Sequence, residues 1–352
     1  MTTSYGSAPQ KKDHIVVMLE DSDGVQGWGE SSPLPEFSGE TVSVVDLILR
    51  TLLLPQVEGA ESFDIAALHG IMDRAVFGNE ASKMAIETAV YDLNAKKLGI
   101  PLYALLGGKV RGKTEINRHI GIVPAEEAVD LARSYVSQGF GSIKLKIGGF
   151  VRDDIARVRA VRIAVGPGVS IRVDANGGYD VPSAWAFIRG VRDCELDMYE
   201  QLLPAWDLDG AAELRRQFGV SLCADEGIRS PMDALAHIRK EAADFFTIKL
   251  VKTGGIYPAL QIAGIAQAAG KGCVIASTFD TQINCAACLH LACALPSATV
   301  ANDLTCYATQ PDMADTCHIL TGGCLAVGDE PGIGVRSLFE FPVTTTSTVG
   351  RR

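Results

Sequence analysis

Residues 142–176 read SIKLKIGGFVRDDIARVRAVRIAVGPGVSIRVDAN, and this stretch decides the fold because it places a helical segment between two apolar strands. The same alternation continues on both sides of it. Further apolar strands are predicted at 115–122, 197–201, 221–226, 245–251, 273–277 and 299–304. Eight strands that alternate with helices predict a parallel β/α barrel, with a doubly wound open sheet as the alternative. No GxGxxG motif follows the first strand, so dinucleotide binding has no support.

The first hundred residues predict a unit of a different kind. HIVVMLE (14–20) and VQGWGE (25–30) are typical of two strands joined by a tight turn, and so predict a β-hairpin. SSPLPEFSGE (31–40) is rich in Ser, Pro and Gly, which is typical of a loop. Helices are predicted at 41–56, 63–76 and 80–99, the last of them amphipathic. A hairpin followed by helices indicates an α+β unit.

Charged residues recur where the predicted barrel strands end. Four of them follow one another at intervals of 26, 25 and 24 residues: Asp174, Glu200, Asp225 and Lys249. Each interval is one β/α unit, so all four are expected at the C-terminal mouth of the barrel, where barrel active sites lie. Three neighbouring carboxylates repel one another unless a cation neutralises them, and hard oxygen ligands favour Mg²⁺ over zinc. Asn176 shares a face with Asp174 and is expected to support the site.

Lysines flank this predicted acidic cluster. Lys144 and Lys146 lie two apart on the second strand, so both are expected to point into the barrel. Lys249 is on the sixth strand, opposite the second in an eight-stranded barrel. Lys144 is expected to lower the proton affinity of Lys146 and so make it a better base. A lone strand-end charge is as often a solvated loop residue, and it is the set in register that favours a site.

This arrangement predicts chemistry at the α-carbon of a small-molecule carboxylate. A cation held by three carboxylates can bind the substrate carboxylate, while a lysine removes the α-proton. The cation then stabilises the charge of the enediolate that forms. Two lysines on opposite faces allow one to remove the proton and the other to return it, which favours racemisation or epimerisation. A lysine on one face alone is compatible with elimination or cycloisomerisation.

Composition excludes several other classes of function. The net charge is −10 and no basic run stands out, so nucleic acid is not an expected partner. No run of about 18 apolar residues exists, so no membrane span is predicted. The nine cysteines all lie in the second half, many inside apolar runs, which predicts reduced thiols in a cytoplasmic protein.

The sequence resembles the enolase superfamily, in particular its muconate-lactonizing subgroup. The segments that carry the resemblance in the barrel are KLK (144–146), VDANGGY (173–179), YEQ (199–201), ADE (224–226) and IKLVKTGG (248–255). Outside the barrel they are GWGE (27–30), AIETAVYDLNAKKLGIPLYALLGG (85–108) and PGIGV (331–335). Together they extend over nearly the whole chain. The seventh strand ends in STFD (277–280) without a His, which argues against the mandelate branch.

The resemblance implies a modified TIM barrel, (β/α)7β, under an α+β capping domain. The cap would comprise residues 1–113 with the C-terminal tail 326–352, and the barrel residues 114–325. The resemblance also implies a Mg²⁺ site, with Mn²⁺ as an alternative ion, and a Lys or His base that works with the metal. The implied metal ligands are Asp174, Glu200 and Asp225, and the implied acid/base residues are Lys146 and Lys249. Glu226 is not expected to be a ligand, because strand alternation turns it away.

Substrate contacts are expected from three further residues. Asp303, at the end of the eighth strand, could pair with a substrate ammonium or cap the following turn. Asp280 is the nearest candidate to the Glu that relatives usually carry beyond the seventh strand, and a capping or loop role is as compatible with it as substrate contact. Tyr5 lies in a segment that resembles the flexible lid. The resulting order of expectation is a racemase or epimerase of an amino-acid-derived carboxylate, then a dehydratase of the hydroxyproline type, then a muconate-type cycloisomerase.

Two expectations concern the whole molecule. Residues 2–7 resemble the middle of the lid loop, so the chain is expected to start inside it, from a misassigned start or in an enzyme with a shorter lid. Because a truncated lid could prevent closure of the site, an inactive homologue remains an alternative. His119, on the first strand, could face either the pocket or the core, with the core favoured. Relatives with this architecture form dimers or octamers, so a homo-oligomer is compatible with the sequence.

Overall fold

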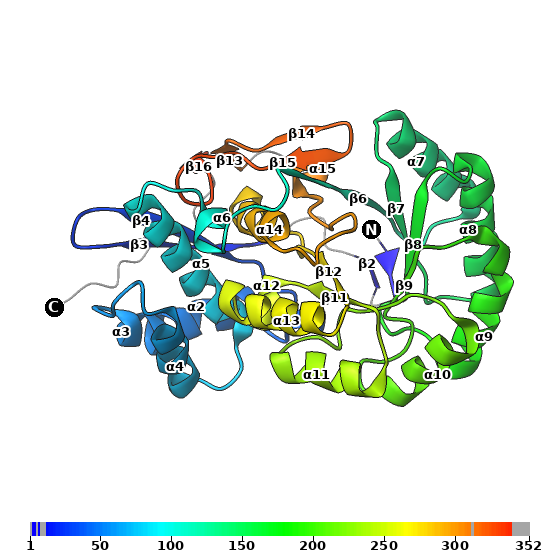
Figure 1. Ribbon diagram of the computed structural model, residues 1–352, viewed down its shortest axis with the longest axis horizontal. Helices are drawn as coiled ribbons and strands as arrows, with labels where there is room; N and C mark the ends of the chain where they lie inside the picture. The colour runs from blue at the N-terminus through cyan, green and yellow to red at the C-terminus, as the bar shows by residue number, and fades with distance from the viewer. Residues whose placement is uncertain (1, 5, 8–11, 311–312, 340–352) are drawn as a thin grey trace.

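The structure, a computed structural model, describes residues 2–4, 6–7, 12–310 and 313–339. Its centre is a curled sheet of seven parallel strands in the order β12-β11-β10-β9-β8-β7-β6 (Figure 1). In chain order these are β6 (Asn117–Ile120), β7 (Ser142–Lys146), β8 (Ser170–Asp174), β9 (Met198–Glu200), β10 (Leu222–Ala224), β11 (Phe245–Ile248) and β12 (Gly272–Ile275). The register pairs Lys146 with Asp174 and Asp174 with Glu200, so these strand-end residues lie at one level.

The predicted eighth strand, 299–304, is not a regular strand. Asn302 and Asp303 each form a single parallel bridge, the first next to β6 and the second next to β12. The side chain of Asn302 accepts a hydrogen bond from the N–H of Ile275 at 2.6 Å, in the place of a ladder bond between strands. The segment therefore joins the first and last strands of the sheet and completes the β/α barrel. It does so through a side-chain hydrogen bond and two isolated bridges instead of a continuous strand ladder.

Helices cover the outside of the barrel, as the alternating pattern predicts (Figure 1). They are α7 (Ala125–Ser137), α8 (Val151–Val165), α9 (Val181–Gly190), α10 (Leu208–Phe218), α11 (Pro231–Lys240), α13 (Ile256–Ala268) and α14 (Gln282–Ala294). A single helical turn, α12 (Leu250–Thr253), precedes α13, and α15 (Cys306–Thr309) follows the bridges. The inner strands are buried along most of their length, so apolar residues from both layers form the barrel core.

The N-terminal part forms the antiparallel α+β cap. Its hairpin is β3 (Ile15–Glu20) with β4 (Gln26–Ser31), and its helical segments are α1 (Pro35–Ser38), α2 (Val42–Ile48), the π-helical turn η1 (Leu49–Leu53), α3 (Leu54–Val57), α4 (Ile65–Ala75), α5 (Glu80–Lys97) and α6 (Leu102–Leu105). The predicted loop 31–40 thus contains the short helix α1. Strand β4 packs tightly on α5: an added Cβ at Gly29 would lie 1.9 Å from the carbonyl oxygen of Ala85. Glycine is required in the GWGE segment for this approach.

Helix α5 is not amphipathic, and that prediction was wrong. Every side chain from Ala81 to Ala95 is buried, including those of Glu87 and Asp92. The helix lies between the hairpin and α12, and its charged side chains are paired by distant segments rather than by water. A helix covered on all sides by tertiary contacts needs no polar face.

The segment after the barrel returns to the cap. Strand β15 (Cys324–Ala326) pairs with β5 (Lys113–Glu115) and β14 (Ile319–Thr321), and β13 (Ala314–Thr316) pairs with β16 (Val335–Leu338). The carboxylate of Asp92 in α5 accepts the N–H of Ile333 at 2.8 Å, so the tail docks on the cap helix. The exact domain boundary at 113/114 stays a prediction. Among the described helices, none has both the length and the apolar character needed to cross a membrane.

Candidate active site

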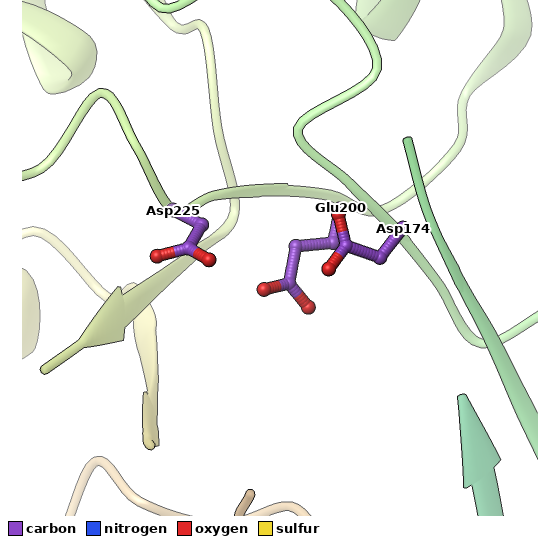
Figure 2. Close-up of side chains that lie close together, drawn as sticks. All are labelled: Asp174, Glu200 and Asp225. Carbon is purple, nitrogen blue, oxygen red and sulfur yellow. The ribbon is translucent and has the colours of Figure 1, made fainter. Parts of the chain in front are cut away.

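Three carboxylates meet at the mouth of the barrel. Asp174 ends β8, Glu200 ends β9, and Asp225 directly follows β10. All three are buried, and each offers an oxygen that lies within 4.8 Å of the other two. Figure 2 shows the side chain of Asp225 on one side and those of Glu200 and Asp174 together on the other. Parallel strands bring their carboxyl ends to one edge, so the predicted spacing places the three groups together.

Lysines from the second strand hold one side of this cluster. The Nζ atom of Lys144 lies 3.0 Å from Oε2 of Glu200 and also bonds Asp303. Burial alone would lower the pKa of Lys144, but the surrounding carboxylates outweigh it and raise that pKa well above its usual value. Lys146 donates to Oδ2 of Asp174 at 2.5 Å and to Oδ1 of Asn176 at 3.0 Å. The predicted influence of Lys144 on Lys146 stays a prediction.

The other side of the cluster is held by helix α12. Lys249, the residue that precedes α12, donates to Oδ2 of Asp225 at 2.5 Å, and its Nζ lies 4.3 Å from the centre of the Phe37 ring. Lys252 is fully buried and donates to Oδ1 of Asp225 at 2.7 Å. Sequence reasoning missed Lys252, although its place one helical turn after Lys249 in IKLVKTGG is a signal that could have identified it.

The electrostatics of the three carboxylates differ. Burial raises the pKa of Glu200 to about 7, and the charges of Asp174 and Asp225 add to this effect. Burial would also raise the pKa of Asp225, but Lys249 and Lys252 outweigh it and hold that pKa below its usual range. Crowded, buried carboxylate oxygens are the ligands that hard divalent cations bind, so the donor set fits the predicted metal. Among the described residues, this is the one group of His, Cys, Asp and Glu side chains with such geometry.

Of the predicted substrate contacts, Asn176 lies beside this cluster and Asp280 lies just before helix α14. Asn176 has a left-handed backbone (φ 45°) and donates through Nδ2 to Glu226 at 2.9 Å, as well as accepting from Lys146. Asp280 is buried and accepts hydrogen bonds from the N–H of Thr278 and from Asn284. Tyr5 lies outside the described residues. Whether these side chains contact substrate stays a prediction.

Asp303 has several protein partners. Its carboxylate bonds Lys144, accepts from Nδ2 of Asn117 at 3.1 Å, and lies 3.2 Å from Nε2 of His119. His119 is therefore turned toward a carboxylate of the barrel interior. Whether His119 serves the pocket or the core stays a prediction. In this structure the Asp303 carboxylate is shared among protein groups, and its contact with a substrate ammonium stays a prediction.

Comparison with known proteins agrees with this geometry. The N-terminal domain model of mandelate racemase and muconate lactonizing enzyme matches residues 1–107, and the "Enolase C-terminal domain-like" model matches residues 127–338. The chain is 33% identical over 290 residues to the N-succinyl-L-Arg/Lys racemase of Bacillus cereus, covering 82% of this chain and 78% of that protein. It is 31% identical over 307 residues to muconate cycloisomerase 1 of Rhodococcus opacus, covering 86% and 81%.

A solved structure extends the comparison to three dimensions. The dipeptide epimerase of Enterococcus faecalis, complexed with Mg and the dipeptide L-Leu-L-Tyr, matches with a TM-score of 0.90 at 32% identity, over 95% of this chain and 94% of that one. These relatives are racemases, epimerases and cycloisomerases of one superfamily. The chain therefore belongs to the enolase superfamily, to the family of mandelate racemase and muconate lactonizing enzyme, and is an enzyme.

Proposed function

We propose that this enzyme is a metal-dependent racemase or epimerase that inverts the α-carbon of an amino-acid-derived carboxylate, such as an N-acylated amino acid or a dipeptide. The observation that carries the proposal is the placement of two lysines at opposite ends of the carboxylate cluster. Lys146 bonds Asp174 at the end contributed by β7 and β8, whereas Lys249 bonds Asp225 at the end contributed by β10 and β11. The racemase and epimerase relatives support the substrate class.

The proposed mechanism assigns a task to each of these side chains. Asp174, Glu200 and Asp225 would hold a divalent cation, which when bound binds the substrate carboxylate and stabilises the charge that develops as the α-proton leaves. Lys146 and Lys249 would face the α-carbon from opposite sides, one taking the proton and the other returning it. Phe37, packed over Lys249, is an apolar wall that keeps water from this side of the α-carbon.

The substrate is expected to carry one carboxylate. The loops at 2–7 and 30–40 contain no Arg or Lys to bind a second one, which is a weak argument against muconate, a diacid. Cycloisomerisation and dehydration nevertheless need only one acid/base face, so both are outcomes that the test below separates. An inactive homologue is a third outcome.

Exchange of the α-hydrogen in D₂O tests the proposal directly. The enzyme with Mg²⁺ would be incubated with each enantiomer or epimer of a panel of N-succinyl amino acids, dipeptides and hydroxyprolines, and separately with muconate, and deuterium incorporation and product formation would be followed by ¹H NMR. The wild-type enzyme is expected to exchange and to invert its substrate. Lys146→Ala and Lys249→Ala are each expected to abolish inversion, yet to leave exchange with one stereoisomer, because a single remaining base still serves one face.

A surface lysine provides the matched control. Lys240 is exposed and pairs with Asp209, so Lys240→Ala is expected to change neither rate. Loss of water from the substrate would show that the enzyme is a dehydratase, and formation of a lactone would show that it is a cycloisomerase. If Lys146→Ala and Lys249→Ala both inverted substrate at the wild-type rate, the two-lysine mechanism would be wrong.

A further inference from the structure

A carboxylate of the cap contacts the start of a barrel helix, seven residues after Lys249 in the chain. Glu87, on cap helix α5, is fully buried and accepts the N–H groups of Ile256 and Tyr257 at 2.5 and 2.7 Å. These two residues belong to the first turn of barrel helix α13. His69, on cap helix α4, donates through Nε2 to the same carboxylate at 2.9 Å and orients it. The cap thus supplies the capping carboxylate for a barrel helix, an interaction that fixes the start of that helix.

The chain between Lys249 and helix α13 has little freedom to move. Only α12 and two glycines lie between Lys249 and Ile256, and Gly254 donates its N–H to the carbonyl of Leu250 at 2.9 Å. Gly255 has a φ of 133°, and an added Cβ there would lie 2.1 Å from Oε2 of Glu87. The backbone of this turn therefore contacts the Glu87 carboxylate directly. A movement of that carboxylate is expected to shift the turn and, with it, helix α12.

Two lysines at helix α12 bind the carboxylate of Asp225. Lys249 precedes the helix and Lys252 lies within it, and both donate to the Asp225 carboxylate. Lys252 also donates to the carbonyl of Thr247 at 3.0 Å, which ties α12 back to β11. Phe37, a second cap residue, lies over the ammonium groups of both lysines. The position of Lys249 therefore depends on contacts that come from the cap.

Lys146 is fixed by different contacts. Its carbonyl accepts from Nη2 of Arg157 on barrel helix α8 at 2.9 Å. The residues that follow β7 are held by Asp154, also on α8, which accepts the N–H groups of Gly148 and Gly149 at 3.0 Å each. These contacts lie within the barrel, and near the N-terminus Ser4 adds a hydrogen bond of 3.4 Å to the carbonyl of Asn176. The two lysines at opposite ends of the carboxylate cluster are therefore positioned chiefly by different parts of the molecule.

From this asymmetry we infer that Glu87 is a positioning residue for Lys249: through the first turn of α13 it holds α12, and it thereby sets the face of the α-carbon that Lys249 serves while leaving the Lys146 face to the barrel. The inference rests on the proposed function. In this view the cap not only covers the site but also controls the proton transfer on the face that Lys249 serves.

The test compares the two half-reactions in Glu87→Gln, which keeps the size of the side chain but replaces one acceptor oxygen by a donor. Lys146→Ala and Lys249→Ala first assign each stereoisomer's α-hydrogen exchange to one lysine. In Glu87→Gln, the Lys249-dependent exchange rate at saturating substrate is expected to fall about tenfold or more, since small displacements of reacting groups have large effects on rate. The Lys146-dependent rate is expected to change by less than about twofold.

Asp92→Asn is the matched control. Asp92 is a buried carboxylate on the same helix and also accepts backbone N–H groups, but those of Trp28 and Ile333, away from α12. This substitution is expected to lower the stability of the cap and to leave the ratio of the two exchange rates at its wild-type value. This ratio is the readout that a purely structural role for Glu87 would not move.

The outcomes separate the two proposals. If neither lysine substitution assigns exchange to one face, the proposed function is wrong. If the lysines divide the faces but Glu87→Gln lowers both exchange rates equally, the function stands and the positioning role is wrong. Should Glu87→Gln not fold, His69→Ala leaves the Glu87 carboxylate in place and removes the donor that orients it, together with the ring contact between His69 and Tyr257. It is expected to shift the ratio in the same direction by a smaller amount, and an unchanged ratio in a folded His69→Ala protein would overturn the inference.

Discussion

The carboxylates of the cap and those at the barrel mouth are equally buried, but they have different partners. The cap carboxylates, Glu30, Glu40, Glu87 and Asp92, lie apart from one another and each accepts backbone N–H groups. Glu30, for example, accepts from Thr281 at 2.8 Å and Asn284 at 3.0 Å at the start of α14. The mouth carboxylates, Asp174, Glu200 and Asp225, face one another and are bonded chiefly by lysines.

This difference separates a structural carboxylate from one that is placed for chemistry. A buried carboxylate that accepts N–H groups at a helix start is satisfied in the protein alone. Three buried carboxylates that share one space repel one another, so their free energy is lowered by a cation. Burial and charge therefore do not identify the site. The convergence of like charges does.

The largest effect is expected when a mouth carboxylate is removed, because these side chains would bind the metal. Asp225→Asn is expected to lower activity roughly 10²- to 10³-fold, because it removes a ligand of the cation that would stabilise the charge developing on the substrate in the transition state. Mg²⁺ is expected to raise the thermal unfolding temperature of the wild-type protein, since a ligand that binds the folded state stabilises it. Asp225→Asn is expected to lose that increase, which differential scanning fluorimetry with and without Mg²⁺ would measure.

The cap provides the contrast for the same measurement. Asp92→Asn is expected to retain the Mg²⁺-dependent increase in unfolding temperature, from whatever starting value its own stability gives. Dialysis against a chelator is expected to abolish wild-type activity, and added Mg²⁺ is expected to restore it. An increase in Asp225→Asn as large as that of the wild-type protein would place the bound ion away from the mouth carboxylates.

The mouth was more predictable from the sequence than the cap junction, for a physical reason. Parallel strands separated by one helix each repeat at a nearly constant interval, so Asp174, Glu200 and Asp225 are brought together by local periodicity alone. Glu87 acts on Ile256, 169 residues further along the chain, and no local pattern encodes that contact.

The errors have the same origin. The period of α5 suggested one apolar face, but tertiary contacts satisfy the polar side chains on its other faces, such as Asp92. The segment around Asn302 has the composition of a strand, but its side-chain amide takes over a ladder hydrogen bond. Lys252 was missed although its spacing from Lys249 is a usable signal, because its contact with Asp225 depends on how α12 packs in the fold.

Stability gives a second, smaller test of the comparison. Glu87→Gln is expected to lower the free energy of unfolding by about 2–3 kcal/mol, because it disrupts charge-assisted hydrogen bonds to buried donors. Glu200→Gln, measured without divalent cations, is expected to change it by less than about 1 kcal/mol or to increase it, because a like charge is removed from a crowded cluster. Urea unfolding in the presence of a chelator measures both. A larger loss for Glu200→Gln than for Glu87→Gln would contradict the distinction between the two sets.

The smallest expected effect distinguishes two members of the cap set by the sign of a pH dependence. Burial would raise the pKa of Glu30, but the His14 ring and the donors of Thr281 outweigh it and hold that pKa below its usual value. Burial raises the pKa of Asp92, and neither Lys96 nor the backbone donors fully offset this. A depressed carboxyl pKa contributes stability that is lost as the pH falls through the acid range, whereas a raised one contributes stability that is gained there.

Comparing each variant with the wild-type protein isolates these contributions. As the pH is lowered below the pKa of an unfolded carboxyl group and through the depressed pKa of Glu30, the stability difference between wild type and Glu30→Gln is expected to shrink, because the wild-type protein loses what Glu30 supplies. The difference between wild type and Asp92→Asn is expected to move in favour of the wild type at a higher pH, as the pH falls through the raised pKa of Asp92 toward that of an unfolded carboxyl group. Denaturant unfolding at a series of pH values from neutral into the acid range measures both. If both stability differences changed with the same sign, the explanation would be wrong for one of the two residues. Either the imidazole and hydrogen-bond donors around Glu30 do not outweigh its burial, or the partners of Asp92 fully offset its burial.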